Sequence, residues 1–148
     1  MCFSAILMYA CHMPTSLACS SSSPWWTCIT ANFIHANVFH VAINVFVLAM
    51  FSFYGYKRYN RVVLIGFVIA SLAFFILRGA TPSCGLSGVI FAIYGILVTR
   101  CMQRRDLLMS AVCIAVTFIP PLNGTLHLVC WLVGFLIGLI YAKKVRQH

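Results

Sequence analysis

Six apolar stretches, separated by short polar or basic segments, limit most strongly how this chain can fold. Only 7% of its residues are charged, whereas a soluble domain usually carries about 25%. This number of charged side chains is too small to cover the surface of a soluble protein of 148 residues. Lipid must therefore solvate most of the chain. Because a helix satisfies its own backbone hydrogen bonds in lipid, we predict an all-α, multi-pass integral membrane protein.

The apolar stretches predict a compact bundle of six transmembrane helices in a single domain, residues 1–148. The expected spans are approximately 1–13, 33–56, 62–77, 86–99, 107–119 and 124–142. The fourth span, with about 14 residues, is shorter than the roughly 20 that a bilayer requires. A loop containing Gly and Pro precedes it, and such backbone is tolerated at membrane depth only beside protein or a wet cavity. We therefore expect the fourth helix to begin inside the membrane.

The first span is also short, which fits either a tilted, minimal helix or a start codon chosen too far downstream.

Basic residues indicate the orientation of the chain in the membrane. Nine of the ten lysines and arginines follow the second, fourth or sixth span, and Arg78 is the exception. The positive-inside rule makes the side that these nine residues share cytoplasmic. We expect the inner membrane of a bacterium, with the basic loops and the C-terminus in the cytoplasm.

The charge and the cysteines argue against several kinds of site. The net charge of +9 does not indicate nucleic-acid binding, because the basic residues cluster between apolar stretches rather than over a soluble face. The eight cysteines contain no C-x-x-C pair and no zinc-like spacing with histidine, so we expect no metal and no cofactor. A disulfide among Cys19, Cys28 and Cys84, on the outer side, stays open, as does the oligomeric state.

Four polar side chains from three predicted helices fall at a common depth. At about 1.5 Å per residue, Ser87 and His127 lie roughly 20 and 24 Å from the basic residues that end their helices. Asn44 and His40 lie about 20 and 25 Å from the end of theirs. All four thus fall in the outer part of a core about 30 Å thick. Ionisable residues inside a membrane are candidate functional residues, although hydrogen bonding between helices is the simpler alternative.

Ser87 is the candidate nucleophile. It begins a predicted helix within Gly85-Leu86-Ser87-Gly88, where the free N–H groups of the helix N-terminus can stabilise a developing oxyanion. The flanking glycines allow close approach of the backbone. Packing of small residues is the alternative explanation of the glycines, but it does not explain why a polar loop enters the membrane.

His127 is the candidate base. Gly134 and Gly138 follow it close to one helical stripe, so a neighbouring helix can approach the imidazole. A neutral histidine can take the serine proton and return it to a leaving amine; the alternative is a buried histidine that donates to a carbonyl. His40 and Asn44 are four residues apart and share a helix face, so both can donate to an oxyanion. No acidic residue lies in the outer half, which leaves a Ser–His dyad.

From Trp26 to Ala142 the chain resembles the rhomboid family of intramembrane serine proteases. The motifs that carry the resemblance are His35-x-x-x-x-His40-x-x-x-Asn44, Gly85-Leu86-Ser87-Gly88, and His127 followed by Gly134 and Gly138. The resemblance implies a catalytic dyad of Ser87 and His127. It also implies an oxyanion hole formed by the Ser87 N–H, His40 and Asn44, and an aromatic contact from Phe91 to His127. His35 and His40, five residues apart, are expected on different helix faces, which argues against a metal pair.

The resemblance implies an endopeptidase that cleaves transmembrane protein substrates near the extracytoplasmic face. Two alternatives stay open: a non-catalytic relative that binds transmembrane helices, and a small channel or transporter. The presence of both Ser87 and His127 disfavours the first. The second would require polar residues through the whole bilayer, whereas here they concentrate in the outer third.

Overall fold

The structure is a computed structural model and describes residues 15–53, 59–101, 103–120 and 122–145. The predicted first span, 1–13, lies outside these residues. The described part is helical, with one isolated antiparallel bridge between Cys19 and Ser83. Its elements are η1 (Thr15–Leu17), α2 (Thr27–Thr30), α3 (Val38–Phe53), α4 (Tyr59–Ile76), α5 (Ser87–Cys101), α6 (Arg104–Val116) and α7 (Gly124–Val145).

Some helices begin at residues other than the expected ones. α3 begins at Val38 rather than at residue 33, because the Asn37 side chain accepts a hydrogen bond from the His40 N–H at 2.9 Å. α6 begins at Arg104 rather than at residue 107, and Asp106 lies in its first turn, where the helix dipole favours a negative charge. α7 begins at Gly124, as predicted.

One described helix, α7, is both long and apolar enough to cross a membrane, over Gly124–Ala142. The stretches Val38–Ser52, Asn60–Ile76 and Ser87–Thr99 are apolar but shorter. Large apolar side chains such as Phe39 and Ile140 remain well exposed, which is typical of a surface that lipid or another apolar partner covers.

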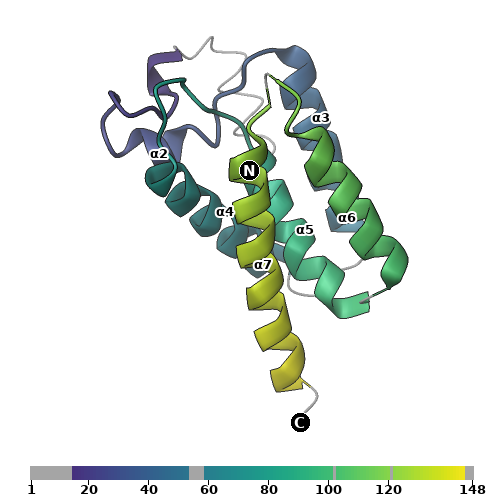
Figure 1. Cartoon of the computed structure of the whole chain (residues 1–148). Helices are drawn as coiled ribbons and strands as arrows, with labels where there is room; N and C mark the ends of the chain where they lie inside the picture. The colour runs from purple at the N-terminus through teal and green to yellow at the C-terminus, as the bar shows by residue number, and fades with distance from the viewer. Residues whose placement is uncertain (1–14, 54–58, 102, 121, 146–148) are drawn as a thin grey trace.

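Helix α5 is the centre of the bundle and packs against α4 and α7 (Figure 1). Its first two turns are fully buried at Val89, Ala92 and Ile93. Glycine makes the contact with α7 close: a Cβ at Gly134 would overlap the Ala92 carbonyl group, and one at Gly95 would overlap the α7 backbone. Figure 1 shows α5 and α7 beginning at the same end of the bundle. This arrangement brings the first turns of the two helices together.

Candidate active site

The first turns of α5 and α7 bring a hydroxyl and an imidazole into contact. Ser87 Oγ lies 2.8 Å from His127 Nε2. If the Ser87 O–H donates to Nε2, the imidazole is neutral and carries its proton on Nδ1. His127 is buried, at 4% exposure, and Ser87 is half-buried. The pair can therefore exchange a proton in a site that is largely shielded from solvent.

An aromatic ring fixes the plane of the imidazole. Phe91, one turn after Ser87 on α5, stacks on His127 with ring centroids 4.7 Å apart and an interplanar angle of 22°. His127 Nδ1 is buried and has no hydrogen-bond partner among the described residues. Packing against Phe91, together with the contact to Ser87, thus orients the ring.

The loop before Ser87 is held by hydrogen bonds to its backbone. Gly85 has a φ of 116°, a conformation that favours glycine, and its N–H donates to the Ala31 carbonyl at 2.8 Å. The next amide, of Leu86, donates to His35 Nε2 at 3.4 Å. His35 Nδ1 lies 3.1 Å from the Phe33 carbonyl, which assigns the ring proton to Nδ1. His35 therefore positions the loop immediately before the candidate nucleophile.

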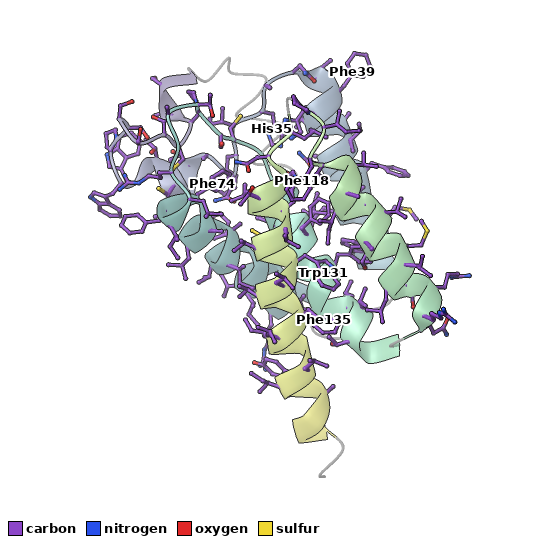
Figure 2. All side chains as sticks on the ribbon, viewed as in Figure 1. His35, Phe39, Phe74, Phe118, Trp131 and Phe135 are labelled. Carbon is purple, nitrogen blue, oxygen red and sulfur yellow. The ribbon has the colours of Figure 1, made fainter. Side chains whose placement is uncertain are left out.

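The expectation that His35 and His40 point to different helix faces is wrong. His35 lies in the loop before α3 (Figure 2), so helical spacing does not apply to the pair. Their rings meet edge to face, with centroids 5.0 Å apart. His40 also lies against Gly85, where a Cβ would be 2.6 Å from its Cε1 and 2.7 Å from its Nε2. A side chain at residue 85 would therefore displace the His40 ring.

Asn44 lies one turn after His40 on α3. Its side chain is buried at 4% exposure, and Nδ2 has no hydrogen-bond partner within the described ranges. Buried amide groups are usually hydrogen-bonded, so an unpaired donor on the helix face that carries His40 needs an explanation. Donation to a reaction intermediate is one such explanation.

Residues 22–147 match the Rhomboid domain. The chain belongs to the rhomboid family. The predicted resemblance is thus confirmed, and membership implies an integral membrane protein. No group of three or more His, Cys, Asp or Glu side chains that could hold a metal occurs in the part of this rhomboid chain that the structure describes.

Curated relatives come from three kinds of organism. Rhomboid-like protease 1 of Toxoplasma gondii is 30% identical over 143 residues, covering 82% of this chain and 49% of the relative. RHOMBOID-like protein 6, mitochondrial, of Arabidopsis thaliana is 24% identical over 139 residues, covering 82% and 45%. Rhomboid protease GluP of Bacillus subtilis (strain 168) is 28% identical over 93 residues, covering 60% and 18%. The rhomboid chain thus spans about half, or less, of these relatives, and no solved structure matches it.

Sequence reasoning missed Asn123, which joins the loop before α7 to the loop before α5. Its Oδ1 accepts from the Leu126 N–H at 3.1 Å and so caps α7, while its Nδ2 donates to Ser83 Oγ at 3.0 Å. An asparagine directly before a predicted helix is a common N-cap, so the cap was readable from the sequence. The hydrogen bond to Ser83, 40 residues away, could not be predicted from the sequence.

We expect Asn123→Ala to lower the free energy of unfolding by about 2 kcal/mol, since it removes a helix cap and an interloop hydrogen bond worth about 1 kcal/mol each. Ser83→Ala is the matched variant: it removes the same interloop bond, keeps the cap and should cost about 1 kcal/mol. Unfolding of both variants in detergent would measure the difference. Equal losses would mean that the cap contributes nothing.

Proposed function

We propose that this chain is an intramembrane serine endopeptidase that cleaves transmembrane proteins through Ser87 and His127. The 2.8 Å contact between Ser87 Oγ and His127 Nε2 is the observation that carries the proposal. Activation of a serine requires a base within this reach. The names of two relatives, Rhomboid-like protease 1 and Rhomboid protease GluP, support the same activity.

The reaction begins when His127 Nε2 takes the Ser87 proton and Ser87 Oγ attacks the scissile carbonyl carbon. The C–N bond then breaks, and His127 returns the proton to the leaving amine, which leaves an acyl group on Ser87. A water molecule, deprotonated by the same imidazole, hydrolyses this ester and regenerates the hydroxyl. The stack of Phe91 on His127 supports one ring orientation for both halves of the reaction.

The negative charge that develops on the carbonyl oxygen needs donors at fixed positions. Three groups are proposed: the Ser87 N–H at the start of α5, the His40 ring and the Asn44 side chain. The first amides of a helix have no partner within the helix, and Asn44 Nδ2 has none among the described residues. The contact of His40 with Gly85 supports its closeness to the same loop.

Asn44→Ala should lower kcat about 100-fold and change KM little, because an oxyanion donor acts mainly in the transition state. Cleavage of a model transmembrane substrate in detergent, measured over a range of substrate concentrations, separates the two constants. Asn60→Ala, which changes an exposed asparagine in the first turn of α4, is the matched control and should behave like the parent. A rise in KM with unchanged kcat would assign Asn44 to substrate binding instead.

The proposed fold is a six-span bundle in which α5 begins inside the membrane. Figure 1 shows that α5 and α7 end, and α6 begins, at the end of the bundle opposite the start of α5, and Ser87 is the first residue of α5. Arg104 and Arg105 begin α6, so these charges lie away from the site. The positive-inside rule then supports a cytoplasmic location for them and an extracytoplasmic opening of the site. The bacterial inner membrane stays a prediction.

Labelling with a serine-reactive fluorophosphonate tests the proposal most directly. The purified protein should be labelled at Ser87, and His127→Ala should slow the labelling at least about 100-fold, because the base is lost. Ser52→Ala, which removes an exposed hydroxyl on α3, should leave labelling unchanged. An unlabelled parent protein would favour the non-catalytic alternative, and ion flux through liposomes without labelling would favour the channel.

A further inference from the structure

Two buried thiols face each other in the segment that precedes α3. Cys19 Sγ and Cys28 Sγ are 2.9 Å apart, and each residue is only 2% exposed. Cys19 Sγ also lies 3.5 Å from the carbonyl oxygen of Phe74, near the end of α4 (Figure 2). A disulfide bond is about 2.05 Å long, so the sulfur atoms need to approach by about 0.9 Å to form one.

One of the two cysteines lies at a point where this segment holds the loop before Ser87, and the other lies close to a second such point. The backbone of Cys19 pairs with that of Ser83 through hydrogen bonds of 3.0 and 2.9 Å. Three residues after Cys28, the Ala31 carbonyl accepts the Gly85 N–H at 2.8 Å. A covalent bond from residue 19 to residue 28 would therefore tie the first anchor of residues 83–85 to a residue three positions before the second.

We propose that Cys19 and Cys28 form a redox pair that closes into a disulfide and stabilises the fold of residues 19–31, the segment that holds the loop leading to Ser87. With oxidised glutathione as the co-reactant, the two thiols give up two protons and two electrons and form the Sγ–Sγ bond. The glutathione disulfide accepts both electrons and both protons and leaves as two thiols. The proposed extracytoplasmic location of this segment is the side on which disulfides persist.

Cys84, the third cysteine of the outer region, is not the partner. It lies in the loop before α5 and is half-buried, whereas the Cys19 thiol lies against Cys28. Burial, and secondarily the neighbouring Cys28 thiol, raises the pKa of Cys19 to about 12. Because the thiolate is the reactive form, exchange in the folded protein should be slow at neutral pH and faster in mildly alkaline buffer.

The experiment uses the full chain in detergent, incubated at mildly alkaline pH with either oxidised glutathione or dithiothreitol. After denaturation, free thiols are alkylated and the peptides are identified by mass. We expect Cys19 and Cys28 to escape alkylation after oxidation and to react after reduction. The oxidised protein should also unfold roughly 5 °C higher than the reduced protein, because the cross-link restricts the unfolded chain.

Four variants sharpen the result. Cys28→Ser and Cys19→Ala should abolish both the protection from alkylation and the difference in unfolding temperature. Cys84→Ser and Cys113→Ser, which change a half-buried and an exposed cysteine, should keep both. Alkylation at residues 19 and 28 of the oxidised parent, or a bond from Cys84 to either of them, would overturn the proposal. Neither readout involves proteolysis, so the outcome is independent of the proposed function.

Discussion

Replacing Ser87 by alanine should reduce cleavage of a transmembrane substrate at least about 1,000-fold, because the nucleophile is lost while the helix start is kept. His127→Ala should have an effect of similar size, and the double variant should be little worse than either single one. Residues that act as a unit in this way are strongly non-additive. The measurement is the initial rate of cleavage of a model transmembrane segment by purified protein in detergent or liposomes.

Unfolding measurements on the same preparations show whether the loss is chemical. Ser87→Ala removes one hydroxyl, so its unfolding temperature should stay close to that of the parent. Ser52→Ala removes a hydroxyl that bonds to the Ala49 carbonyl on α3 and should retain full cleavage. If Ser87→Ala cleaves as fast as the parent, the proposed mechanism is wrong.

The second large effect is expected at the contact of α5 with α7. Gly134→Ala puts a Cβ onto the carbonyl group of Ala92, and a backbone group cannot rotate away as a side chain can. The two helices must separate, and we expect a loss of about 3 kcal/mol, which lowers the unfolding temperature by roughly 10 °C. Because His127 lies two turns before Gly134, the loss of labelling at Ser87 should accompany the loss of stability.

Gly79→Ala is the matched control for the glycine substitution. Gly79 lies in the loop after α4, and a Cβ there would meet no atom within 4 Å. This variant should unfold and label like the parent. Parent-like stability in Gly134→Ala would mean that α5 and α7 are not packed as closely as the structure has them.

Hydrophobic pattern alone was enough to predict the helical elements that carry the site. Long apolar stretches in a chain with few charges leave little choice but helices, and the predicted starts of the helices at Leu86 and Gly124 fall within one residue of those of α5 and α7. Depth arithmetic placed Ser87 and His127 at one level, and their side chains are in contact. Their catalytic roles stay predictions.

Contacts made by loops could not be read from the same pattern. Helical spacing predicts that His35 shares a helix with His40, but the Asn37 cap starts α3 after His35. The His35 ring instead accepts the Leu86 N–H in the loop before Ser87. Asn123 and Ser83 meet across 40 residues, and no periodicity reports such a pair. The contact of Cys19 with Cys28 likewise depends on how an irregular segment folds back on itself.

Ser83 is hydrogen-bonded to two other parts of the chain. Its backbone is paired with Cys19 and its hydroxyl with Asn123, so three segments distant in sequence meet four residues ahead of the nucleophile. Trp25, 64% exposed, belongs to the first of these segments. A molecule that bound at Trp25 would therefore contact a segment that is hydrogen-bonded to the chain just before the proposed nucleophile.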